Sequence, residues 1–154
     1  MSLRTTQTVH GSYLMPSLGH ASVADAMHPG IITCDAEATL TEVARTMATH
    51  HVHSVAVLSL ARGSGPSEEA EIWGIVSDLD LISAGIRGGP ERPAADLAHQ
   101  PPLIVEPTLP LREAGELMVA HGAPHALVVE PATNRPVGML STLDIVGILA
   151  WGEA

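Results

Sequence analysis

Aromatic and basic residues are scarce in this sequence. Its 154 residues include no Phe, one Tyr and two Trp, and seven Lys and Arg face seventeen Asp and Glu, for a formal net charge of −10. Proteins that bind nucleic acids neutralise phosphates with basic side chains and often stack bases on aromatic rings. The composition therefore excludes a nucleic-acid partner. It remains compatible with a single nucleotide in a cleft, where local groups decide binding.

Cysteine and long apolar runs are also scarce. Cys34 has no second thiol in the chain to pair with, which favours a reducing, cytoplasmic compartment. No stretch approaches the roughly 20 apolar residues that a membrane helix needs, and the first twenty residues lack the apolar centre of a secretion signal. We therefore expect a cytoplasmic protein without a membrane partner. The 45% of hydrophobic residues suffice for the core of one domain or two small halves.

The sequence contains an internal repeat. With a shift of 71 residues, Asp25 aligns with Asp96, and most of the following hydrophobic positions also match. From Gly74 onward the shift is 64 residues, so that "GIVSDLDLI" (74–82) aligns with "GMLSTLDIV" (138–146). The difference of seven residues falls in 61–71, where Gly, Ser, Pro and charged residues predict a solvated loop. Two copies of about 60 residues indicate two equivalent structural units.

Each copy predicts the same order of elements. Each copy begins with a short helix (23–27 or 94–98) and a short strand (31–34 or 102–105). A longer helix follows. Its start is marked by a capping box at Thr39–Glu42 in the first copy and by Pro110 in the second. Two strands (55–59 and 72–76; 126–129 and 137–140) and a last helix (79–86 or 143–151) follow. The long helices show the i, i+3, i+4, i+7, i+8 pattern of one buried face: Leu40, Val43, Ala44, Met47 and Ala48, then Leu111, Ala114, Gly115, Met118 and Val119.

The unit is thus β-α-β-β-α, and the fold class is α/β. Neither unit can bury its apolar sheet face alone, so we expect the two units to dock sheet to sheet. The doubled unit, with Gly-apolar-apolar-Ser-x-x-Asp before each last helix, resembles a tandem CBS domain, or Bateman module, over residues 22–151. The resemblance implies pseudo-twofold symmetry, with an N-terminal tail (1–21), CBS repeat 1 (22–89) and CBS repeat 2 (90–154).

The resemblance also implies a function. Tandem CBS domains are regulatory modules that sense an adenosine-containing ligand, such as AMP, ADP, ATP or S-adenosylmethionine, in the cleft between the repeats. They commonly form homodimers through their helices and act on an effector protein, which this sequence does not identify. We expect no catalytic residues and no required cofactor, since the sequence has no P-loop and no Gly-x-Ser-x-Gly motif.

The Ser-x-x-Asp segments have two compatible interpretations. Ser is a favoured N-cap, and an acidic residue suits the first turn of a helix. A helix N-terminus also suits phosphate, and the resemblance implies that Asp80 and Asp144 bind ribose beside Ser77 and Ser141. At the next position, Thr142 can donate a hydrogen bond to phosphate, whereas Asp78 would repel it. We therefore expect the site of Asp144 to suit phosphate better.

The resemblance places the base in an apolar slot formed by the first strand and the strand after the long helix. For most of the aliphatic residues in this set a plain core role is the favoured interpretation; the set is Ile32, Thr33, Val55, Ala56, Leu103, Ile104, Ala126 and Leu127. His53 and His125 match positions that face phosphates in the family, although Ser54 and Pro124 depart from the family pattern. A solvated helix end is the alternative role for these histidines.

Two further hypotheses remain open. The chain could be a structural or protein-interaction module whose nucleotide sites are not functional. It could also be a metal-responsive protein, if its clustered histidines meet between the halves: His50, His51, His53, His121 and His125. Their spacing matches no standard zinc signature, so we expect no metal site.

Overall fold

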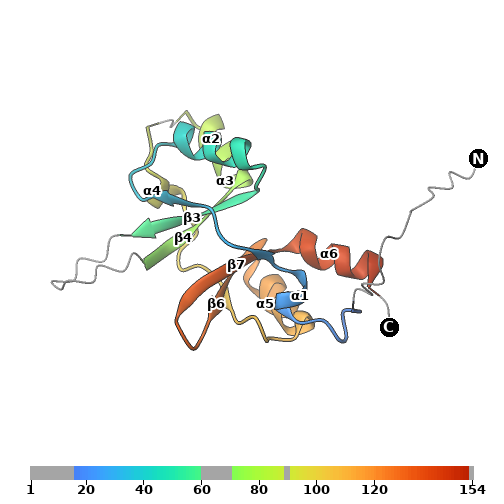
Figure 1. Cartoon of the computed structure of the whole chain (residues 1–154). Coiled ribbons are helices and arrows are strands. Elements are labelled where there is room, and N and C mark those ends of the chain that lie inside the picture. The colour runs from blue at the N-terminus through green and yellow to red at the C-terminus, as the bar shows by residue number, and fades with distance from the viewer. Residues whose placement is uncertain (1–15, 60–70, 89–90, 153–154) are drawn as a thin grey trace, which may run out of the picture.

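The computed structural model describes residues 16–59, 71–88 and 91–152. Most of the predicted N-terminal tail and the predicted loop at 61–70 lie outside these ranges. Figure 1 shows two stacked units, each with a sheet and its helices. The upper unit contains β2 (Thr33–Asp35), α2 (Leu40–His50), β3 (Ser54–Ser59), β4 (Glu71–Ser77), α3 (Asp78–Ile86) and α4 (Ala94–Leu97). The lower unit contains α1 (Val23–Ala26), β1 (His28–Pro29), β5 (Ile104–Val105), α5 (Leu111–His121), β6 (His125–Glu130), β7 (Arg135–Ser141) and α6 (Thr142–Trp151).

The predicted order of elements is confirmed in both copies. The strands after the long helices begin and end within one or two residues of their predicted bounds, and the first strands are shorter than predicted. The Thr39–Glu42 capping box is formed, with the Thr39 N–H donating to Glu42 Oε2 at 2.9 Å. Pro110 is the N-cap residue of α5. The fold is therefore the predicted α/β arrangement.

Each sheet has the same internal topology. In the first sheet, β2 pairs in parallel with β3, and β3 pairs antiparallel with β4. In the second sheet, β5, β6 and β7 repeat this arrangement, and β1 adds a fourth strand beside β7. The sequence did not predict β1. Its two residues are too few to show the alternation that identifies a strand, and they pair with a partner strand more than 100 residues later, where His28 lies opposite Met139.

The opening segment of each sequence repeat lies on the other repeat's unit. α1 packs against α5 and α6, and α4 packs against β3, β4 and α3 (Figure 1). The chain therefore crosses between the units twice, at residues 27–32 and 98–103, which we call the first and second crossover segments. Each structural unit contains residues of both sequence repeats, and the boundaries at 21/22 and 89/90 remain predictions about the sequence repeat.

Each unit has its own hydrophobic core between its sheet and its helices, which we call the helix-side core. The buried residues of α2 are Val43 and Met47, and those of α5 are Leu111, Ala114 and Met118. The predicted stripe was wrong at its last position, because Ala48 is exposed and Val119 is 84% exposed. At 100° per residue, position i+8 lies about 80° from position i, so it falls at the edge of the buried face.

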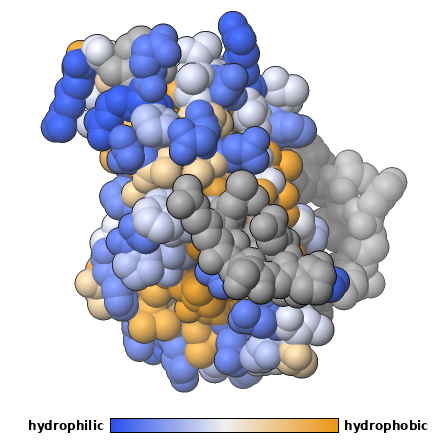
Figure 2. Space-filling model, turned by 90° about the vertical axis from the view of Figure 1, so that its left-hand side faces the viewer, coloured by the Kyte–Doolittle hydropathy of each residue, from blue (hydrophilic) through white to orange (hydrophobic). Residues whose placement is uncertain are grey.

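The two sheets face each other in the middle of the molecule (Figure 1). Ala56, Ile75 and Leu127 are at most 5% exposed, yet they belong to neither helix-side core. Since side chains alternate along a strand, these residues point away from the helices, toward the other sheet. Figure 2 shows an outer face, with polar residues predominating over the upper unit and apolar residues gathered over the lower one. None of the helices in the described ranges has the length and hydropathy to cross a bilayer.

Candidate ligand clefts between the two repeats

Gly74 and Gly138 open the two repeated motifs because another backbone lies against them. A β-carbon at Gly138 would lie 2.5 Å from the carbonyl oxygen of His28, and one at Gly74 would overlap the carbonyl oxygen of His99. The His99 N–H donates to the Ile75 carbonyl at 2.9 Å, which holds the second crossover segment on β4. Each motif therefore begins with a glycine so that a crossover segment can pass directly over the strand.

The Ser-x-x-Asp corners form the N-caps of α3 and α6. The Ser77 N–H donates to Asp80 Oδ2 at 2.8 Å, and the Asp80 N–H donates back to Ser77 Oγ at 3.3 Å. The corresponding distances at Ser141 and Asp144 are 2.8 and 3.2 Å. The predicted capping role is therefore confirmed for both corners. In each carboxylate these bonds engage Oδ2 and leave Oδ1 available to another donor.

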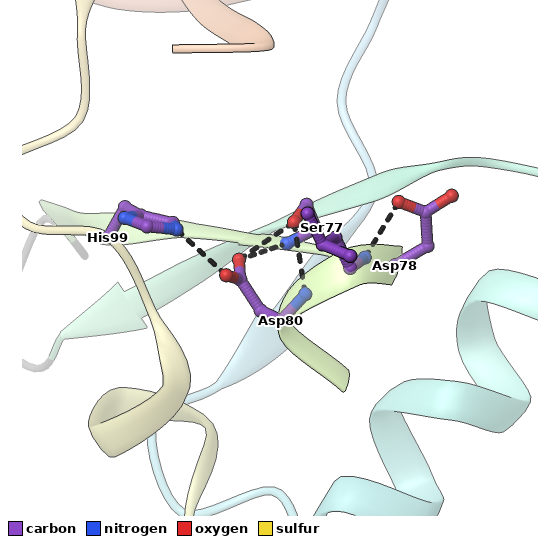
Figure 3. A network of polar contacts seen from close by, with 5 residues as sticks. Ser77, Asp78, Asp80 and His99 are labelled. Carbon is purple, nitrogen blue, oxygen red and sulfur yellow. Dashed lines mark hydrogen bonds and ion pairs between the residues drawn. The ribbon is translucent and has the colours of Figure 1, made fainter. Parts of the chain in front are cut away.

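A histidine from each crossover segment donates to that second oxygen. His99 Nε2 lies 2.7 Å from Asp80 Oδ1, and His28 Nε2 lies 2.9 Å from Asp144 Oδ1. Since a carboxylate only accepts, the imidazole nitrogen is the donor. Figure 3 shows His99 reaching Asp80 from the side opposite Asp78. No local motif in the sequence indicates these two histidines, although the 71-residue shift aligns His28 with His99.

Two cavities lie beside these corners, in equivalent positions. Cleft A has a volume of about 480 Å³ and is lined by the first crossover segment, the residues between α2 and β3, and part of β7 and α6. Cleft B has a volume of about 300 Å³ and is lined by the second crossover segment, the residues between α5 and β6, and part of β4. Both volumes fall in the range of small-molecule sites.

The structure distributes the predicted site residues unevenly. His53 and Ser141 line cleft A, Ser77 and Ile104 line cleft B, and His125 lines both. Asp80 and Asp144 line neither cleft, but each contacts a histidine that does, His99 and His28 respectively. Thr33 lies on β2 outside both clefts, and Thr142 lines an apolar groove between α5 and α6.

The crossover segments and the first residue of β5 contribute apolar side chains to the clefts. Ile31 and Ile32 line cleft A, and Leu103 and Ile104 line cleft B. The strand residues expected to complete the slot line neither cleft, because two of them face the helix-side cores and two face the other sheet. They are Val55, Ala126, Ala56 and Leu127. For these four the core interpretation is the one that the structure supports.

A small cluster of titratable groups lies between the clefts. His53 Nδ1 is 3.0 Å from Asp78 Oδ2, and this hydrogen bond holds the pKa of Asp78 below its usual value, although partial burial opposes the effect. Burial lowers the pKa of His125, and the nearby Asp78 carboxylate offsets part of that effect. Since His53 lines cleft A, the charge of Asp78 acts on that cleft as well. The better suitability of the Asp144 corner for phosphate therefore stays a prediction.

The histidines do not assemble a metal site among the described residues. His50, His51 and His53 lie at cleft A, and His121 lies at cleft B. In the part of the chain that the structure describes, no group of three or more His, Cys, Asp or Glu side chains is placed to hold a metal ion. Cys34 is half-buried on β2, where burial, and secondarily Asp35, raises the pKa of its thiol to about 11.

Comparison with protein families gives one tandem match. The family model described as CBS domain matches residues 23–87 and again residues 94–150. Among curated proteins, the uncharacterized protein MK0525 of Methanopyrus kandleri is 27% identical over 130 residues, which cover 82% of this chain and 62% of that protein. The chain thus spans less than two thirds of the length of this relative.

Solved structures share the fold at low sequence identity. The CBS domain pair of protein MJ0100, in complex with 5′-methylthioadenosine and S-adenosylmethionine, has a TM-score of 0.71 and 16% identity, and the match covers 84% of this chain and 96% of that one. The CBS domain of a bacterial CNNM/CorC family Mg²⁺ transporter in complex with ATP has a TM-score of 0.69 and 19% identity, with 88% and 92% covered. Hypoxic Response Protein I, with two coordinated zinc ions, has a TM-score of 0.61 and 21% identity, with 82% and 98% covered.

Proposed function

We propose that this chain, which belongs to the CBS domain family, is a non-catalytic regulatory module that binds an adenosine-containing ligand in the clefts between its two repeats. The observation that carries the proposal is the pair of equivalent clefts. Each one combines apolar crossover residues, the serine cap of a helix N-terminus, and a histidine that contacts the capping aspartate behind it. Similar CBS pairs have been solved with methylthioadenosine, S-adenosylmethionine or ATP, which supports the choice of ligand class.

The residues provide suitable partners for each part of such a ligand. Aliphatic side chains such as Ile32 in cleft A and Leu103 in cleft B can cover the faces of an adenine ring. The carboxylates of Asp144 and Asp80 can accept hydrogen bonds from the two ribose hydroxyls. The 5′ substituent would then lie toward Ser141 or Ser77 and the N–H groups at the start of α6 or α3.

The charges at the clefts favour ligands with few phosphates. No Arg or Lys is found among the described residues that line either cleft, and Asp78, Asp80 and Asp144 lie close by. A polyphosphate would depend on neutral or partly charged histidines, which bind phosphate less firmly than guanidinium groups. We therefore expect methylthioadenosine, S-adenosylmethionine and AMP to bind more tightly than ADP or ATP.

A second candidate is a structural or protein-interaction module with unused sites. One observation favours it specifically: both oxygens of each corner carboxylate already accept bonds from the protein itself. On this hypothesis the aspartates serve only to hold the crossover segments against the helix caps. The two candidates differ in whether any adenosine ligand stabilises the folded protein.

We also propose that the chain forms a homodimer through α3 and α6. Leu79 and Ile82 on α3 are 69% and 58% exposed, and the equivalent residues Leu143 and Val146 on α6 are 66% and 52% exposed. Because the same apolar pair occurs twice in symmetry-related positions, a second copy can present a self-complementary surface. An effector protein would read the state of this dimer, and the lone Cys34 suits a reducing, cytoplasmic compartment.

Thermal unfolding with added ligands tests the proposal. A ligand at 100 times its dissociation constant should stabilise the folded protein by about 2.7 kcal/mol. We expect 5′-methylthioadenosine, S-adenosylmethionine and AMP to raise the melting temperature, ATP to raise it less, and GMP to leave it unchanged. If none of the adenosine ligands changes the melting temperature, the structural module is the better description. Mass spectrometry of small molecules that co-purify with the native protein would identify the ligand directly.

A further inference from the structure

The two aspartates at the clefts have a partner that the proposed function does not require. In each corner carboxylate, Oδ2 accepts a hydrogen bond from the capping serine and Oδ1 accepts one from a histidine of a crossover segment. A third helix has a similar box without a histidine: the Ser22 N–H donates to Asp25 Oδ2 at 2.8 Å at the start of α1. The histidine contact is thus an addition to the cap, and among the capping aspartates of the described residues only Asp80 and Asp144 have it.

The exposure of the two partners shows which one can move. The side chains of Asp144 and Asp80 are 8% and 16% exposed, whereas those of His28 and His99 are 78% and 72% exposed. Each imidazole therefore lies over its carboxylate on the solvent side. The backbone of His28 is held separately by pairing with Met139, and that of His99 by bonds to Ile75. The rings can consequently turn away without moving the crossover segments.

We propose that His28 and His99 compete with the ligand for the cleft carboxylates and thereby set the affinity of each cleft. The inference rests on the proposed function, because the competitor is the ribose diol of the adenosine ligand. In the empty protein the imidazole donates to Oδ1; in the complex a ribose hydroxyl donates there and the imidazole turns out into solvent. Since ion pairs with one exposed partner contribute little free energy, a ligand can displace the ring at small cost.

Calorimetry on three variants tests the competition. Removing one ring in His28→Ala or His99→Ala should lower the dissociation constant of 5′-methylthioadenosine at the cleft concerned by about two- to fivefold, which corresponds to the loss of one exposed pair. The double variant should tighten both clefts. 2′,3′-Dideoxyadenosine, which lacks both ribose hydroxyls, should bind the variants and the unmodified protein equally. His20→Ala is the control, because His20 contacts Ser17 and lines neither cleft.

The outcomes separate this inference from the proposed function. If the unmodified protein binds methylthioadenosine and the alanine variants bind it no more tightly, the competition is excluded while the proposed function stands. Equal tightening of the dideoxy analogue would also exclude it, since the ring would then only block space. If the unmodified protein shows no binding but the double variant does, the competition is supported in its strongest form. If neither binds, both proposals are overturned.

Discussion

Single carboxylates have three roles in this protein, and their surroundings determine which one applies. Asp25, Asp80 and Asp144 each close a capping box. Asp80 and Asp144 also accept a bond from a crossover histidine. Asp78, one position after the cap, instead contacts His53 between the clefts. The same residue type therefore acts as a cap, as a candidate ribose acceptor or as a local negative charge.

Replacement of the cleft aspartates should weaken ligand binding. If the ribose bonds are charge-assisted, Asp144→Ala should reduce the binding free energy of 5′-methylthioadenosine in cleft A by about 1.5–3 kcal/mol, and Asp80→Ala should do the same in cleft B. Asp25→Ala is the matched control, because it removes the same type of cap at a carboxylate that, among the described residues, bonds Ser22 and no cleft histidine. Unchanged calorimetric affinity in both cleft variants would contradict the proposed role of these carboxylates.

The half-buried His125 should make stability depend on pH. Because burial lowers its pKa in the folded state, the unfolded chain binds the proton more readily. Stability from the neutral imidazole is thus complete above the ordinary pKa of about 6.5 and is lost as the pH falls through the lowered value. Urea unfolding at pH 7.0 and 5.5 should show a smaller loss of stability in His125→Gln than in the unmodified protein. Equal losses would show that other groups control this range.

At the scale of elements, the packing of backbone on backbone explains the glycines of the repeated motif. Gly74 and Gly138 lie where a crossover carbonyl meets the strand, whereas a β-carbon at Gly85 on α3 would meet no neighbouring atom within 4 Å. The first two glycines are required by close approach. The third contributes only its conformational freedom, which disfavours a helix.

This difference predicts opposite effects of the same substitution. Gly74→Ala should destabilise the protein by about 1–3 kcal/mol, because its methyl group would overlap the His99 carbonyl and move the second crossover segment. Gly85→Ala should leave stability unchanged or increase it by up to about 1 kcal/mol, since alanine favours a helix. Chemical denaturation measures both changes. Similar free energies of unfolding for the two variants would disprove the close contact at Gly74.

At the scale of elements, the local sequence pattern predicted the bounds of some helices and strands closely and missed others. The strand predicted at 126–129 is found at His125–Glu130, and the helix predicted at 79–86 is found at Asp78–Ile86. The predicted strand is a continuous run of apolar residues, and the helix begins directly after the Ser77 cap. β1 was missed because its two residues carry no period, and the last position of the helix stripe was wrong because only the centre of a helix face is fully covered.

At the scale of the whole molecule, the two units share one architecture but differ in charge. The position of Asp78 in the first copy is held by Thr142 in the second, and His53 corresponds to Pro124. The pair of His53 and Asp78 therefore has no counterpart across the pseudo-twofold axis. The clefts are equivalent in their backbone and unequal in their electrostatics, which gives a physical basis for different affinities.

The exposed apolar residues of α3 and α6 predict the assembly state. Ile82→Asp combined with Val146→Asp should convert the proposed dimer into a monomer, because each charge would be desolvated in the interface. Sedimentation equilibrium measures the change directly. Ala132→Asp is the control, since this exposed residue lies in the turn between β6 and β7. A double variant that remains dimeric, or an unmodified protein that is monomeric, would contradict the proposed interface.

The sequence by itself determined the repeat, the order of elements, the capped Ser-x-x-Asp corners and the resemblance to a CBS pair. These features are local, because periodicity, caps and motif spacing depend on residues only a few positions apart. Only the tertiary structure decided that each opening segment crosses to the other unit, that Gly74 and Gly138 lie under the crossover backbones, and that His28 and His99 lie on Asp144 and Asp80. The 71-residue shift identifies equivalent histidines. Their partners depend on how the two units pack, which no spacing along the chain specifies.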